Sequence, residues 1–181
     1  EEELEKVKPY VKYFVNAAGC GINKKIKETD LMDCNRMLEV NCNALTLLTK
    51  IVLPYCGKRS RIVMLASASA FLPQPGFAVY AASKSYVLSF SRALRRELKK
   101  TGTTVTIVCP GPVDTPFLDT IGGKDSIPVI KRPFIMKTDK VVSVAIKDAA
   151  KGKELSIPGI SMKCFFRICK IVPHKVLLKF T

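Results

Sequence analysis

Three short runs rich in β-branched and other apolar residues alternate with longer helical stretches, and this alternation limits the folds open to the chain. The runs cover residues 10–15, 61–67 and 103–109. The helical stretches between them cover residues 31–55 and, approximately, 79–100. Strands that alternate with helices form parallel sheets through right-handed crossovers. The sequence therefore predicts an α/β fold with a doubly wound parallel sheet.

Polar or turn-forming residues follow each of these runs. The first run continues into Asn16-Ala-Ala-Gly19, the second ends at Ser67, and the third continues into Pro110-Gly-Pro-Val-Asp-Thr115. Ligands in open α/β sheets bind in the crevice outside the carboxyl ends of the strands. We therefore expect these three segments to lie together at one edge of the sheet.

Tyr80 and Lys84 lie four residues apart near the start of the second helical stretch. Residues at this spacing share one face of a helix, with Cβ atoms about 5–6 Å apart. A nearby ammonium favours the phenolate, so we expect Lys84 to lower the pKa of Tyr80 from its free value of about 10. A phenol tuned in this way can give or take a proton near neutral pH, as carbonyl reduction requires. Alone, the pair is more typical of a surface helix, because the pattern is short and both residues are common.

Together with other segments, the pair resembles the signature of the short-chain dehydrogenase/reductase family. The segments occur in the family's order and at compatible spacings, and they are Asn16-Ala-Ala-Gly19, Glu39-Val-Asn41, Ser67, Tyr80-x-x-x-Lys84 and Pro110-Gly111-x-x-x-Thr115. The resemblance covers residues 10–160, approximately. The basic end of the chain, from Ser156-Ile-Pro-Gly159 onward, resembles the branch that includes fatty-acyl and hydroxysteroid reductases.

The resemblance implies an NAD(P)-dependent oxidoreductase that interconverts a small-molecule ketone and a secondary alcohol by hydride transfer. Tyr80 is the implied general acid or base, Lys84 lowers its pKa and binds the nicotinamide ribose, and Ser67 polarises the substrate carbonyl. Asn41 is implied to hold a water that connects the lysine to solvent. The implied cofactor-binding residues are Asn16, Ala17, Gly19, Tyr80, Lys84, Pro110, Gly111, Val113 and Thr115.

Several of these residues also have simpler explanations. Asn16 is compatible with ordinary turn chemistry, and Pro110-Gly111 with the end of a strand. Asn41 has a low helix propensity, and a solvated face explains it as well as a catalytic role does. Strand alternation places Ser69 on the same face as Ser67, so that only the family's spacing to the tyrosine selects Ser67.

The first half of the family's cofactor site has no counterpart in this chain. A complete member begins with a strand, a glycine-rich turn and a helix N-terminus that receives the pyrophosphate, and then reaches a residue that selects NAD or NADP. No G-x-x-x-G-x-G occurs here, and Glu1-Glu-Glu-Leu-Glu resembles the end of the helix before the family's fourth strand. We therefore interpret the chain as a partial Rossmann-like fold, from the fourth strand onward, of a longer reductase. NAD or NADP is the expected cofactor, with NADP slightly favoured.

This interpretation predicts how the chain behaves alone. Residues 10–15 would form a sheet edge with unpaired backbone groups. We expect the 181 residues to be poorly soluble or partly disordered, and their activity alone is doubtful because they should bind nicotinamide cofactor weakly or not at all. A soluble monomer with a cooperative thermal transition and micromolar NADPH binding would contradict this expectation. The complete protein is expected to form a homo-oligomer, as the resemblance implies.

Composition fits an intracellular globular chain. At 48% hydrophobic residues, 181 residues can bury one sizeable core. The seven cysteines show no C-x-x-C spacing, which predicts reduced thiols and a cytoplasmic location, and the single histidine argues against a metal site. The net charge of +15 does not predict nucleic-acid binding, because no recognised motif or interleaved aromatic residues accompany it. Attraction of an anionic cofactor or an acyl-type substrate, or simple solvation, explains it better.

We divide the chain into a partial Rossmann-like catalytic domain, residues 1–160, and a basic amphipathic segment, residues 161–181. The segment can lie at a membrane interface or in a neighbouring subunit's groove, or it can form a helix that closes over the substrate site or the core. Residues 120–133 occupy the place of the family's substrate loop. Two alternatives to the enzyme remain for the chain as a whole. One is a non-catalytic fragment or interaction protein that retains half of the fold, and the other is a peripheral membrane-binding module.

Overall fold

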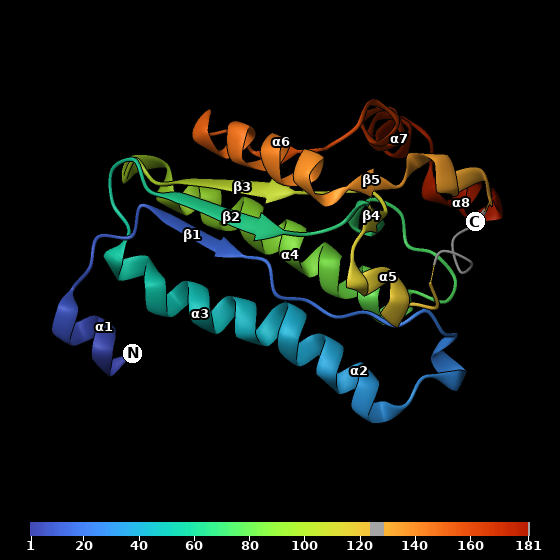
Figure 1. Cartoon of the computed structure of the whole chain (residues 1–181), viewed down its shortest axis with the longest axis horizontal. Helices are drawn as coiled ribbons and strands as arrows, with labels where there is room; N and C mark the ends of the chain where they lie inside the picture. The colour runs from blue at the N-terminus through green and yellow to red at the C-terminus, as the bar shows by residue number, and fades with distance from the viewer. Residues whose placement is uncertain (124–128, 181) are drawn as a thin grey trace.

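A parallel sheet lies between two layers of helices in the computed structural model, which describes residues 1–123 and 129–180 (Figure 1). The strands of this sheet, in spatial order, are β1 (Tyr13–Asn16), β2 (Arg61–Leu65), β3 (Thr104–Val108) and β6 (Leu155–Ser156). Each neighbouring pair is parallel, with Phe14 opposite Ile62 and Ile62 opposite Val105. Two short strands, β4 (Val113–Asp114) and β5 (Met136–Lys137), pair separately. The predicted α/β fold with a parallel sheet is confirmed.

Long helices cover one face of this sheet, where the sequence predicts them. One continuous rod consists of α2 (Leu31–Leu38), the π-helical segment η2 (Glu39–Ala44), α3 (Leu45–Val52) and the 3-10 turn η3 (Leu53–Tyr55). Asp30 caps the start of the rod by accepting a hydrogen bond from the backbone N–H of Met32 at 2.7 Å. Beside the rod lies α4 (Ala78–Glu97), which is followed by the 3-10 turn η5 (Leu98–Lys100).

The remaining helices lie on the other face and at both ends of the sheet, and the N-terminal helix is the one near the amino ends of the strands (Figure 1). They are α1 (Glu2–Val7), α5 (Pro116–Thr120), α6 (Thr138–Ala150), α7 (Ile160–Ile171) and α8 (His174–Leu177). Short 3-10 segments join them, namely η1 (Ile26–Glu28), η4 (Ala68–Ala70), η7 (Val129–Phe134) and η8 (Leu178–Phe180). The substrate loop expected at residues 120–133 falls partly outside the described residues, because 124–128 are not among them.

Strand alternation divides the core into two layers. Ile62 and Met64 of β2 face α4 and pack in the same cluster as Val87. Val63 points the opposite way and packs with Ala149 of α6. Helices cover both faces of β2 and β3, so most side chains on both faces are apolar. The sequences of these two strands are therefore nearly continuous apolar runs.

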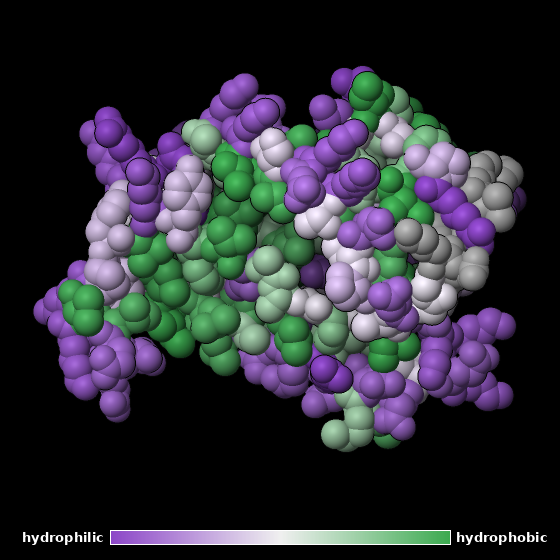
Figure 2. Space-filling view, viewed as in Figure 1, coloured by the Kyte–Doolittle hydropathy of each residue, from purple (hydrophilic) through white to green (hydrophobic). Residues whose placement is uncertain are grey.

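β1 forms an edge of the described sheet, and its α6-facing side is uncovered. Val15 is 57% exposed there, and Ile146 of α6 is exposed to a similar extent. Figure 2 shows a broad hydrophobic surface on this side of the molecule, between α6 and the long helical rod. The edge position expected for residues 10–15 is therefore present, with an apolar face beside it.

The C-terminal segment packs on the body of the molecule through α7. The Phe166 ring lies 4.6 Å from the Phe71 ring, measured between centroids, and Met162 and Cys169 also contact the core. The sequence left open whether this segment binds a membrane, binds a neighbouring subunit or folds over the core. One side of α7 packs over the core. Within residues 1–123 and 129–180, no helix is both long and apolar enough to span a membrane.

Candidate active site

A cavity of about 1070 Å³ opens at the carboxyl ends of the strands. It extends from the inner side of α7 to the uncovered face above β1. Its lining includes most of the predicted site residues: Ala17, Gly19, Ser67, Tyr80, Lys84, Pro110, Gly111, Val113 and Thr115. Asn16 and Asn41 are not part of the lining. The sheet thus brings together segments that are far apart in the sequence, as expected for a parallel α/β fold.

Tyr80 lies in the first turn of α4 with its ring held between two phenylalanines. The centroid of its ring is 5.6 Å from that of Phe77 and 5.5 Å from that of Phe117. Burial raises the pKa of the Tyr80 phenol above its usual value, and a side-chain hydrogen bond with Ser67 acts in the opposite direction. The side chains of Ser67 and Tyr80 both line the cavity.

Ser67 is fixed at the point where β2 gives way to a 3-10 turn. Its backbone is extended, and its Oγ accepts a hydrogen bond from the backbone N–H of Ser69 at 3.2 Å. Because the chain turns here, strand alternation does not continue to Ser69. Both serines line the cavity, but it is the Ser67 side chain that acts on the pKa of the Tyr80 phenol, in the direction opposite to burial.

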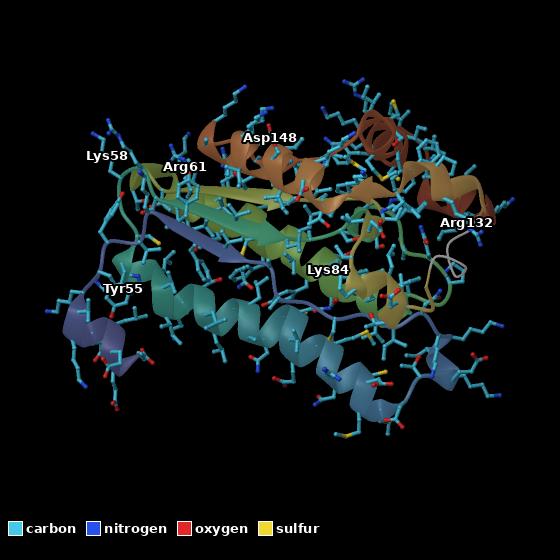
Figure 3. All side chains as sticks on the ribbon, viewed as in Figure 1. Tyr55, Lys58, Arg61, Lys84, Arg132 and Asp148 are labelled. Atoms are coloured by element: carbon cyan, nitrogen blue, oxygen red, sulfur yellow. The ribbon has the colours of Figure 1, made fainter. Side chains whose placement is uncertain are left out.

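Lys84 lies one turn further along α4 and points toward the end of β2 (Figure 3). Its Nζ donates a hydrogen bond to the Leu65 carbonyl oxygen at 3.0 Å and lies 5.8 Å from the centroid of the Tyr80 ring. Burial lowers the pKa of Lys84 to about 8. The prediction that Lys84 lowers the pKa of Tyr80 is not met in this structure, because desolvation of the phenol dominates and the ammonium is directed at a backbone carbonyl.

Asn41 is fully buried in the π-helical segment, so the alternative of a solvated face is wrong. Its Nδ2 donates to the Cys20 carbonyl oxygen at 2.8 Å and to Ser83 Oγ at 2.9 Å. Its Oδ1 accepts from the backbone N–H of Cys20 at 2.9 Å. Asn41 therefore ties the loop after β1 to α4. The wider π turn is a feature often found at functional sites.

Two glycines leave the space that these side chains occupy. A Cβ on Gly19 would lie 3.0 Å from Lys84 Nζ and 3.2 Å from Asn41 Oδ1. A Cβ on Gly21 would lie 2.7 Å from Tyr80 Cδ2. Real Cβ atoms do not approach this closely without a shift of their neighbours. Gly19 was a predicted site residue, whereas the need for glycine at position 21 was not predicted.

The other predicted residues shape the cavity from its edges. Asn16 is buried, and its Nδ2 donates to the Leu45 carbonyl oxygen at 3.3 Å, which joins the end of β1 to α3. The Pro110 carbonyl oxygen accepts from the backbone N–H of Ala68 at 2.8 Å and so joins the ends of β2 and β3. Thr115 precedes α5, and its Oγ1 donates to a carbonyl oxygen two residues earlier, at 3.3 Å.

Thiol and metal chemistry find less support at this cavity. Burial raises the pKa of the nearby Cys109 thiol to about 12, so this group stays protonated at neutral pH. In the part of the chain that the structure describes, no three His, Cys, Asp or Glu residues gather in a way that could hold a metal ion. Of the predicted catalytic groups, the hydroxyls of Ser67 and Tyr80 and the amine of Lys84 line the cavity, whereas the amide of Asn41 is buried outside the lining.

Comparison with known proteins identifies the family. The family described as short chain dehydrogenase matches residues 2–125, which is more than half of the chain. The chain belongs to the short-chain dehydrogenase family.

Curated relatives of this short-chain dehydrogenase are oxidoreductases. An uncharacterized oxidoreductase of Staphylococcus epidermidis is 35% identical over 112 residues, which are 61% of this chain and 49% of the relative. Sulfoacetaldehyde reductase 2 of Chromohalobacter salexigens is 38% identical over 120 residues, which are 64% of this chain and 48% of the relative. The chain thus spans about half the length of the curated relatives it matches.

Solved structures share the fold of this short-chain dehydrogenase. A short chain dehydrogenase from Burkholderia cenocepacia J2315, in complex with NADP, matches with a TM-score of 0.80 at 19% identity, covering 97% of this chain and 72% of that one. The 3-ketoacyl-(acyl-carrier-protein) reductase from Brucella melitensis, complexed with NADH, matches with a TM-score of 0.71 at 26% identity, covering 88% and 69%.

Three further residues of the candidate site were not predicted from the sequence. Phe77 and Phe117 enclose the Tyr80 ring, and Met162 of α7 covers Gly111, where a Cβ would lie 2.5 Å from the Met162 Sδ. The two phenylalanines flank predicted motifs, so proximity in sequence could have suggested them. Nothing in the sequence pairs Met162 with Gly111, because that contact depends on how α7 packs.

Proposed function

We propose that this chain carries the catalytic site of an NAD(P)-dependent oxidoreductase that interconverts a ketone and a secondary alcohol by hydride transfer. The observation that supports it most is the arrangement of Ser67, Tyr80 and Lys84. Both hydroxyls line one cavity, the Ser67 side chain acts on the pKa of the Tyr80 phenol, and the ammonium lies 5.8 Å from the centroid of the phenol ring. Family membership supports the same reaction class.

Ser67 and Tyr80 are suited to hold a carbonyl oxygen between them. Each hydroxyl can donate a hydrogen bond, and such bonds strengthen as negative charge develops on the oxygen during reduction. Tyr80 then donates its proton to the nascent alkoxide, or accepts it from the alcohol in the reverse direction. Because burial raises its pKa, the phenol is protonated at neutral pH, which supports the role of proton donor.

Lys84 and Asn41 can renew that proton. An amine with a pKa of about 8 exchanges protons near neutral pH. Lys84 Nζ and Asn41 Oδ1 both lie near Gly19, at 3.0 Å and 3.2 Å from the point where its Cβ would be, and we propose that a water connects them. Asn41 would therefore position this water, as the resemblance implies, while its amide nitrogen fixes the loop at Cys20.

The cofactor, when bound, supplies or accepts the hydride. The residues present fit its nicotinamide side, because Gly19 and Gly111 bring bare backbone to the cavity wall, and Gly19 also leaves room for Lys84 Nζ and Asn41 Oδ1. Residues proposed to hold it are Ala17, Gly19, Tyr80, Lys84, Pro110, Gly111, Val113 and Thr115, and Asn16 would act by fixing the strand end. Since the sequence has no glycine-rich pyrophosphate motif, we propose that a preceding segment of the same protein provides it. NADP, a homo-oligomeric complete protein and a cytoplasmic location stay predictions from the sequence.

The test uses the product of the complete reading frame that contains these residues. It is incubated with NADPH or NADH that carries deuterium at the reactive C4 position and with a panel of ketones. We expect deuterium at the carbinol carbon of the alcohol formed from at least one ketone, detected by mass spectrometry. Omission of the protein gives the background. Tight cofactor binding without deuterium in any alcohol would contradict the proposal.

A further inference from the structure

The outward face of α7 and the residues of α8 combine exposed apolar side chains with basic ones. Ile160 and Ile171, at the two ends of α7, are each 81% exposed. Residues 155–181 contain no Asp or Glu. They contain five strongly basic residues, which are Lys163, Arg167, Lys170, Lys175 and Lys179. We call the surface formed by Ile160, Lys163, Arg167, Ile171 and the basic residues of α8 the α7–α8 face.

Helical geometry separates this face from the packed side of α7. Met162, Phe165, Phe166 and Cys169 contact the core. Ile160 and Ile171, with Lys163 and Arg167, follow spacings of three, four and four residues, which place them along one stripe on the opposite side. The stripe is therefore not explained by packing within the described chain.

The apolar part of the stripe continues into the cavity. Ile168 is exposed and also lines the cavity, and Cys164, one turn earlier, does the same. α7 thus presents one edge to the cavity and the adjoining face to solvent. A surface bound to the α7–α8 face would lie next to the rim of the cavity.

We propose that the α7–α8 face docks on an anionic membrane surface, with α7 lying along the interface. A helix in the headgroup region buries its apolar side chains, while lysines and arginines attract anionic lipids. Nucleic acid would use the basic residues but would leave both isoleucines in water. A second copy bound through the same face would bring like charges together. The combination of charge and apolar surface therefore favours the membrane.

Vesicle flotation of the product of the complete reading frame that contains these residues tests this docking. Flotation separates bound protein, which rises with vesicles, from aggregates, which sediment. The probes are vesicles of phosphatidylcholine mixed with phosphatidylglycerol, and vesicles of phosphatidylcholine alone. We expect the chain to float with the mixed vesicles and to bind those of phosphatidylcholine alone far more weakly.

Two variants separate the contributions of charge and apolar surface. Lys163→Gln/Arg167→Gln/Lys175→Gln removes three basic residues of this face and should weaken partitioning on the order of a hundredfold, at about 1 kcal/mol for each charge. Ile160→Ser/Ile171→Ser keeps the charge and should weaken it on the order of tenfold. The matched control, Lys24→Gln/Lys25→Gln/Lys27→Gln, removes the same charge from an exposed cluster at η1 and should bind as the unmodified chain does.

Four outcomes would overturn the proposal. One is equal weakening by the η1 control, which would show a general effect of net charge. Another is unchanged binding in the isoleucine variant, which would show that no apolar side chain enters the interface. The third is tighter binding of a short DNA duplex than of mixed vesicles, measured by fluorescence anisotropy. The last is a self-associated chain that the isoleucine variant converts to a monomer, which would show that a second copy covers this face.

Discussion

Tyr80→Phe is expected to lower kcat/KM for ketone reduction by about a hundredfold to ten-thousandfold, the usual contribution of a general acid. The substitution removes only the phenol hydroxyl. The ring can remain between Phe77 and Phe117, so the fold should be retained. Steady-state kinetics on the complete reading-frame product measure the loss, and circular dichroism checks the fold.

Tyr86→Phe is the matched control for this substitution. Tyr86 lies on the same helix, and its hydroxyl is hydrogen-bonded to Thr46 Oγ1 at 2.7 Å, outside the cavity lining. Loss of this hydroxyl should leave kcat/KM within about twofold, because the largest effects come only from groups that touch the reacting atoms. If both variants retain full activity, Tyr80 is not the proton donor.

Lys84→Met is expected to change how stability depends on pH. The folded-state pKa of Lys84 is lowered from 10.5 to about 8. Below pH 8, burial of the ammonium therefore lowers the free energy of unfolding by about 3 kcal/mol. Between pH 8 and 10.5 the unfolded state binds the extra proton, and this cost fades as pH rises. The free energy of unfolding of the unmodified protein should therefore rise relative to that of Lys84→Met by about 3 kcal/mol over this window.

Urea denaturation of both proteins at pH 7 and pH 10 measures this difference. Thiols and phenols titrate in the same pH range in both proteins. Their contribution to the free energy of unfolding therefore cancels when the value for one protein is subtracted from that for the other. The variant should also lose activity, because nothing then holds the nicotinamide ribose or resupplies the proton. A difference in unfolding free energy that is the same at both pH values would show that Lys84 is not buried as a charged group.

Local patterns in the sequence were sufficient to predict the framework of the fold. The β-branched runs near residues 62 and 105 indicated the central strands, and the four-residue spacing of Tyr80 and Lys84 indicated their shared helix face. Both signals are local, since they depend on side-chain periodicity along one element. The position of Ser67 beside Tyr80 required the family's spacing as well, because Ser69 satisfies the same local pattern.

What the sequence did not predict depends on tertiary packing. The raised pKa of Tyr80 results from burial, which outweighs the opposing effect of the Ser67 side chain. The side chain of Asn41 is bonded to a distant loop and to α4, and these contacts cannot be read from its own helix. The same holds for Gly111, whose small size matters only because α7 places Met162 on it.

A structure of the complete protein with NADP and a ketone substrate analogue tests the central claim most directly. The proposed mechanism predicts that the carbonyl oxygen of the analogue lies about 2.6–3.2 Å from both Tyr80 Oη and Ser67 Oγ, with the nicotinamide ring in the cavity near Gly111. An analogue bound with its carbonyl oxygen away from both hydroxyls, or a nicotinamide outside the cavity, would contradict the assignment of these residues to catalysis.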